Sequence, residues 1–133
     1  MAKDTGEADT LDAFKAGDID GAWVPEPWAT RLVDEGGGKV LVDESDLWTA
    51  TKGQFVTTQL LVRTEFLKDH PDTVKAIIEG LAGAIDFIGT DAAKAEQDVA
   101  DQIGTITGKA PKVELVAKTF ANLTFTLDPI AAS

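Results

Sequence analysis

The chain has 133 residues, enough for one domain with a single core, and 44% of them are hydrophobic. Its 12 basic and 23 acidic residues give a formal net charge of −11, which argues against binding to nucleic acid or to an anionic membrane surface. Cysteine is absent, which excludes disulfides, thiolate nucleophiles and most structural zinc sites.

The first half of the sequence predicts alternating helices and strands. Residues 8–17 predict a short helix with Asp9 as its N-cap and Gly17 ending it at the C′ position. A strand is expected over 18–25, and a second helix over 26–38 with Pro27 in its first turn. A short buried strand over 39–45 and a loop over 46–53 complete this half.

The second half is richer in helix. Residues 54–64 predict the strongest strand, because β-branched and aromatic side chains are concentrated there. A brief helical turn over 65–69 precedes the clearest helix, over 70–89, which has Pro71 in its first turn. Its apolar stripe recurs at helical spacing: Val74, Ile77, Ile78, Leu81, Ile85 and Ile88.

Two further helices over 91–104 and 111–123 precede a tail, 124–133, that is expected to be extended and then irregular. These elements predict an α/β fold with a helix-rich C-terminal half. Its strands are too few for a complete sheet, because a parallel sheet needs both faces covered. We therefore expect an incomplete sheet, part of a larger one.

Three groups of residues carry a resemblance to a known family: Phe14, Gly17 and Ile19-Asp20-Gly21, then Glu26-Pro27-Trp28, then Gly36–Gly38 before Val40-Leu41. In this order they resemble the substrate-binding proteins of ABC importers for nitrate, sulfonate and taurine-like solutes. The stretches 62–81 and 125–132 are similar to later parts of the same family. One departure is Gly21, where the family often has alanine.

The resemblance implies part of a periplasmic-binding-protein type II fold, its C-terminal half only. Residues 1–52 would be the end of the second lobe, and 53–133 the hinge strand and the C-terminal helices of the first lobe. The two lobes would close on a small solute, and the closed protein would dock on an ABC permease. The parent protein would be extracytoplasmic, periplasmic or lipid-anchored, although this chain shows no signal peptide and the resemblance implies no cofactor.

The candidate ligand-binding residues near the first strand are Trp23, Glu26, Pro27 and Trp28. The Glu26 carboxylate could accept hydrogen bonds from a ligand amine, which favours an aminosulfonate over bare nitrate. An alternative of equal weight is that Glu26 favours the positive end of the following helix. Trp23 and Trp28 could form a flat apolar wall of the site, or could simply be core residues.

Thr57, Thr58 and Gln59, on the expected hinge strand, are the remaining candidates. Their side chains could donate hydrogen bonds to sulfonate oxygens, or could face neighbouring strands instead. The unpaired edges of an incomplete sheet also predict a homodimer or a strand-swapped oligomer. Half of the binding cleft would be missing, so the isolated chain is expected to bind solute weakly or not at all.

An enzyme is not expected. The only histidine, His70, precedes Pro71 at a helix start, where capping or plain exposure is the expected role. The Gly-rich stretch at 36–39 lacks the spacing of a phosphate-binding loop. Two alternatives stay open: a stand-alone interaction or oligomerisation module without solute binding, and an enzyme related to pyrimidine synthases.

Overall fold

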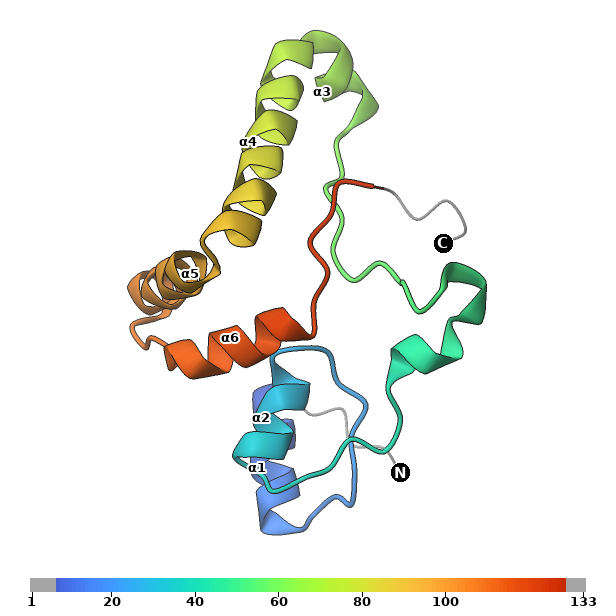
Figure 1. Ribbon diagram of the computed structural model, residues 1–133, viewed down its shortest axis with the longest axis vertical. Coiled ribbons are helices and arrows are strands. Elements are labelled where there is room, and N and C mark those ends of the chain that lie inside the picture. The colour runs from blue at the N-terminus through green and yellow to red at the C-terminus, as the bar shows by residue number, and fades with distance from the viewer. Residues whose placement is uncertain (1–6, 129–133) are drawn as a thin grey trace. The chain divides into compact units, whose positions relative to one another are not determined.

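The computed structural model describes the backbone of residues 7–128 and the side chains of residues 9–128. The described range contains six α-helices and two short 3₁₀ helices (Figure 1). Their bounds in chain order are α1 (Glu7–Ala16), α2 (Trp28–Asp34), η1 (Glu44–Leu47), η2 (Thr49–Thr51), α3 (Thr64–Asp69), α4 (Pro71–Thr90), α5 (Ala92–Thr107) and α6 (Val113–Ala121).

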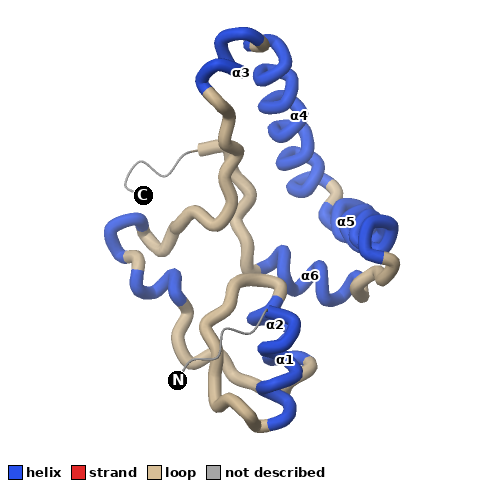
Figure 2. The backbone as a smooth tube through the Cα atoms, turned by 180° about the vertical axis from the view of Figure 1, so that it is seen from behind, coloured by secondary structure: helices blue, strands red, loops and turns tan. Residues whose placement is uncertain are grey.

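The expected α/β fold with its incomplete sheet is wrong, because no strand forms between residues 7 and 128 (Figure 2). The three segments predicted as strands, 18–25, 39–45 and 54–64, are mainly loop, with η1 and the start of α3 at the ends of the last two. A β-strand exists only when its N–H and C=O groups pair with a neighbour, and a pattern of β-branched residues cannot supply that partner. The expectation of a homodimer or strand-swapped oligomer was based on unpaired strand edges, and it loses that basis because the described residues form no strand.

The helices were predicted more accurately. The expected helices over 65–69, 70–89, 91–104 and 111–123 correspond to α3, α4, α5 and α6. Pro71 opens α4, as predicted, where its missing N–H would have no partner in any case. His70 lies at the N-cap of α4 without a capping side-chain hydrogen bond, and it is exposed.

Helix α1 begins earlier than predicted and ends as predicted. It starts at Glu7, so Asp9 lies inside the helix and is not its N-cap. At the other end Gly17 has a φ of 78°, its N–H donates to the Phe14 carbonyl, and the Asp18 N–H donates to the Ala13 carbonyl. This pair of hydrogen bonds is a Schellman motif, which needs a left-handed residue and therefore favours glycine.

The described residues divide into two compact units. Within the described range, unit 1 comprises residues 7–41 and Glu96–Thr124, and unit 2 comprises Val42–Ala95 and residues 125–128; the expected tail at 129–133 lies outside the described residues. In unit 1, α2 packs against both α1 and α6. Its buried apolar side chains are Leu11, Leu32, Ala100 and Val116.

A glycine turn after α2 closes the contact with α1. A Cβ at Gly36 would lie 2.7 Å from the Leu32 carbonyl oxygen and 3.0 Å from the Phe14 ring. Phe14 projects from α1, so a side chain at position 36 would collide with both helices. The glycines that end α2 therefore allow the chain to turn closely over the Phe14 ring.

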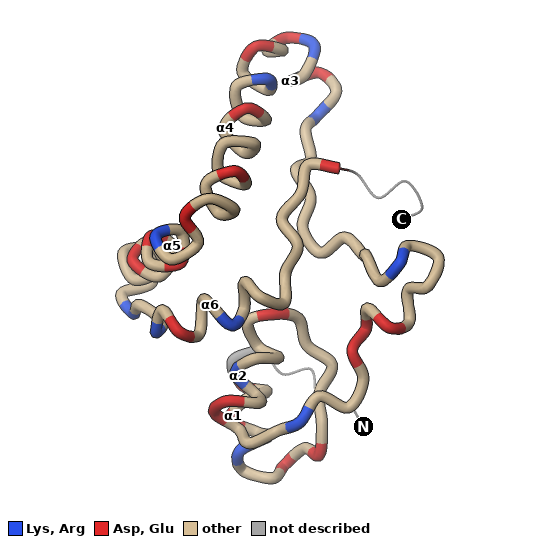
Figure 3. The backbone as a smooth tube through the Cα atoms, viewed as in Figure 1, with Lys and Arg blue, Asp and Glu red and all other residues tan. Residues whose placement is uncertain are grey.

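Unit 2 contains η1, η2, α3, α4 and the first residues of α5, and α3 packs against α4. Of the predicted α4 stripe, Val74 is buried, whereas Ile77, Ile78 and Leu81 are exposed. Residues 54–62 of this unit carry no charged side chain (Figure 3), and Leu61 there is strongly exposed. Unit 2 thus leaves much of its apolar surface in contact with solvent.

Candidate functional site

The start of α2 lacks an ordinary cap. Its N-cap residue is Pro27, which has no side-chain acceptor for the free N–H groups of the first turn. Glu26, one residue earlier, performs this function: its Oε2 accepts from the Thr30 N–H at 3.2 Å, and its Oε1 accepts from the Thr30 hydroxyl at 3.0 Å. The helix-start interpretation of Glu26 therefore has direct geometric support.

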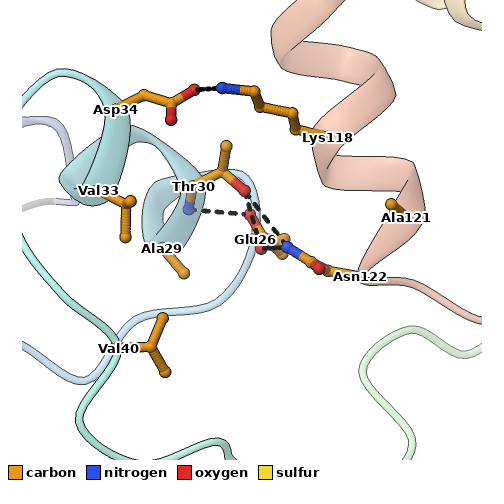
Figure 4. Close-up of a pocket in the computed structure, with 9 residues that line it drawn as sticks. All are labelled: Glu26, Ala29, Thr30, Val33, Asp34, Val40, Lys118, Ala121 and Asn122. Atoms are coloured by element: carbon orange, nitrogen blue, oxygen red, sulfur yellow. Dashed lines mark hydrogen bonds and ion pairs between the residues drawn. The ribbon is translucent and has the colours of Figure 1, made fainter.

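Glu26 also joins two segments far apart in sequence. The Asn122 side-chain amide, directly after α6, donates to Glu26 Oε1 at 2.6 Å. The same amide lies 3.5 Å from the Thr30 hydroxyl oxygen. Figure 4 shows Glu26, Thr30 and Asn122 meeting between α2 and α6.

A second bridge joins the same two helices. Lys118 Nζ lies 2.5 Å from Asp34 Oδ2, with the Lys118 side chain 57% exposed and that of Asp34 34% exposed. An ion pair this exposed contributes little to stability, because water screens the attraction and ordering the side chains costs entropy. It does place a cation beside the Asp34 carboxylate of α2.

These two bridges lie along a groove of about 380 Å³ within unit 1 (Figure 4). Its apolar lining residues come from α2, from the segment after it, and from α6. The groove has the size of a small-molecule pocket and combines apolar walls with a few polar groups. The lining residues are Glu26, Ala29, Thr30, Val33, Asp34, Val40, Lys118, Ala121 and Asn122.

The other candidates near Glu26 lie elsewhere. Trp23 is 72% exposed and Pro27 is exposed, and neither is a lining residue of this groove. The half-buried Trp28 ring has the Arg31 guanidinium carbon 4.7 Å from its centroid, a cation–π contact. The apolar wall expected from Trp23 and Trp28 thus does not line the groove, whose walls are aliphatic.

Arg31 is held over Trp28 by a second contact. Its Nε donates to Glu35 Oε1 at 2.7 Å, and this hydrogen bond raises the pKa of Arg31 and lowers the pKa of Glu35. Lys15 of α1 lies 3.6 Å from the same carboxylate. This charge cluster lies at the exposed C-terminal end of α2, where water screens it and its contribution to stability is small.

Thr57, Thr58 and Gln59 belong to unit 2. All three are exposed, in a loop segment rather than a strand. The loop before them is ordered by its own contacts: Trp48 stacks on Phe55 with ring centroids 5.9 Å apart. Their assignment to a binding site remains a prediction.

Sequence reasoning missed Thr30, Asp34, Lys118 and Asn122. A weak signal was present, because Thr30 and Asp34, like Lys118 and Asn122, are four residues apart and so share a helix face. Nothing in the sequence indicated that these two faces meet. No group of three potential metal-ligating side chains occurs among the described residues, and no helix in that part of the chain is long and apolar enough to span a membrane.

A helical chain with an aliphatic groove and charged ends is consistent with a small-molecule-binding protein. A model of the NMT1-like family matches residues 2–104, more than half of the chain. The chain therefore belongs to the NMT1-like family, and the resemblance seen in its sequence is confirmed at the family level. Helix α6 lies beyond the matched range.

One similar protein is the bicarbonate transport ATP-binding protein CmpC of Synechocystis sp. (strain ATCC 27184 / PCC 6803 / Kazusa). It is 37% identical to the chain over 77 residues, which cover 55% of this chain and 11% of CmpC. The chain thus corresponds to a small part of that much longer protein. No solved structure matches the chain significantly.

Proposed function

We propose that the chain is a solute-binding component of an ABC importer, or a part of one, for small sulfonate-, taurine- or nitrate-like molecules. Membership in the NMT1-like family carries this proposal. The similarity to CmpC, whose name denotes a bicarbonate transport protein, supports a role in the uptake of a small solute. The ATP-binding role in that name does not extend to this chain, because its sequence has no phosphate-binding loop of the required spacing.

The proposed mechanism is binding without chemistry. The solute stabilises a closed state by contacting groups on both sides of its site, and the closed protein is then recognised by a permease. Glu26 contributes an acceptor for a solute amine, and the aliphatic groove beside it removes the rest of the solute from water. An extracytoplasmic location follows from this role, because an importer captures its solute outside the cell.

An NMR titration of the ¹⁵N-labelled chain tests the proposal. Taurine, methanesulfonate, nitrate and bicarbonate are added to millimolar concentration, a range in which weak binding is still visible. Saturable shifts of amides in residues 23–34 with at least one of these solutes support solute binding. No saturable shift with any of them refutes solute binding by this chain.

The same samples address the two other functions. A stable oligomer in analytical ultracentrifugation, with no solute response, would favour an interaction module. Release of a new product from a pyrimidine precursor would favour an enzyme. Either result would contradict the proposed function.

A further inference from the structure

The two bridges between α2 and α6 form a matched pair. Thr30 and Asp34 are four residues apart on α2, and Lys118 and Asn122 are four residues apart in and just after α6. Asn122 meets Thr30 and Glu26, whereas Lys118 meets Asp34, so the two segments run antiparallel here. Four residues of helix advance about 6 Å, which sets the distance between the bridges.

Each bridge retains unused binding capacity. An ionised carboxylate has about four acceptor sites, and in the described structure the Glu26 carboxylate accepts from Thr30 N–H, Thr30 O–H and Asn122. A lysine ammonium has three donors, and among the described residues the contact of Lys118 is with Asp34. A ligand ammonium can therefore be added at Glu26, and a ligand anion at Lys118, while the internal contacts persist.

The charges of the groove select against a simple anion. Glu26 and Asp34 are negative and Lys118 is positive, so the lining carries one net negative charge in a chain of net charge −11. This negative charge repels an isolated anion, whereas a zwitterion carries a positive group that can pair with Glu26. Between the two charged ends, Ala29, Val33 and Ala121 offer an aliphatic surface suited to a methylene chain.

We propose that the groove between α2 and α6 binds an ω-amino acid or ω-amino sulfonate whose ammonium binds Glu26 and whose anionic group binds Lys118. This inference rests on the proposed function and specifies its substrate class. Bonds of about 1.5 Å advance about 1.25 Å each in a zigzag chain, so a spacer of about four carbons matches the 6 Å between the bridges. Taurine, with two carbons, is too short to reach both ends.

The test uses a matched series of probes and NMR of the full chain. The probes are 4-aminobutanesulfonate, 5-aminopentanoate, taurine, butylammonium and butanesulfonate. We expect the two long zwitterions to shift the Asn122 side-chain amide and the backbone amide of Lys118. Each should bind about fivefold more tightly than taurine or either singly charged probe, the gain expected from one additional exposed charge contact. The ratio of the dissociation constants of the two long zwitterions shows whether the groove prefers a sulfonate or a carboxylate as the anionic group.

Charge-neutral variants test the two ends separately. Glu26→Gln and Lys118→Met should each weaken 4-aminobutanesulfonate binding about fivefold. The control Lys112→Met, on an exposed residue that precedes α6 and does not line the groove, should leave binding unchanged. Dispersed NMR spectra would show that the variants fold, and Glu26→Asp replaces Glu26→Gln if the latter does not.

Three results would overturn this inference. Butylammonium binding as tightly as the long zwitterions would show that Lys118 has no part. If taurine or nitrate bound more tightly than the long zwitterions, and Lys118→Met did not change that binding, the ligand assigned to the groove would be wrong while the proposed function would stand. Absence of binding by every probe, including the solutes tested above, would refute both.

Discussion

Glu26 should couple the stability of α2 to that of α6, and the structure gives the size of this coupling. Glu26→Ala removes a capping contact to the Thr30 N–H, worth about 1 kcal/mol, and the Asn122 hydrogen bond, worth about 0.5–1 kcal/mol at this partly exposed position. We therefore expect a loss of about 1.5–2 kcal/mol in the free energy of unfolding of unit 1.

A double-mutant cycle isolates the contact with α6. Asn122→Ala alone should cost about 0.5–1 kcal/mol in wild-type background and almost nothing once Glu26 is alanine, because its acceptor is gone. The coupling energy then equals that cost. Urea unfolding followed by NMR at α2 and α6 amides measures each corner of the cycle. Glu35→Ala, at the C-cap of α2 and paired with Arg31, serves as the control, and its effect should simply add to that of Asn122→Ala. Additive effects of the two substitutions would refute the assigned role of Glu26.

Three further predictions concern packing and pH. Gly36→Ala should lower the free energy of unfolding by about 1–3 kcal/mol, because its Cβ would lie 2.7 Å from a backbone oxygen. The control Gly21→Ala, with open space around it, should cost much less. Thermal melts of the two variants compare them directly. The Arg31 hydrogen bond lowers the pKa of Glu35 below its ordinary 4.5, so this pair stabilises the fold above that pH and stops doing so as pH falls through the lowered value. Glu35→Gln should therefore be less stable than wild type near neutral pH and equally stable in acid, and a constant difference across urea titrations at several pH values would contradict this assignment. Val74→Ala should destabilise unit 2 by about 2 kcal/mol, measured as faster hydrogen exchange in α4, because Val74 is buried there; unchanged exchange would show that its burial contributes nothing.

Short-range interactions determine where the helices form, and the sequence therefore predicts them well. Apolar side chains at helical spacing and Pro71 in a first turn identified α4, and Gly17 marked the end of α1. These signals act within a few residues, so they need no knowledge of the remaining fold. The motif around Glu26-Pro27-Trp28 likewise indicated the family, which the family match confirms.

The expected strands failed for the opposite reason. The segments over 18–25 and 54–64 have the residue types of strands, but strand formation depends on a partner elsewhere in the chain. The described residues provide none. Residue type alone therefore predicted strands that do not form among the described residues.

The same distinction holds at the site. The sequence selected Glu26 and left its role open between ligand contact and helix start. The groove depends on Asn122, 96 residues away from Glu26, and on Lys118, 84 residues away from Asp34. The sequence by itself thus determined the helices, the acidic charge and the family, because these follow from composition and short-range pattern. Only the tertiary structure decided which side chains meet across α2 and α6, because packing brings together residues that no local pattern links.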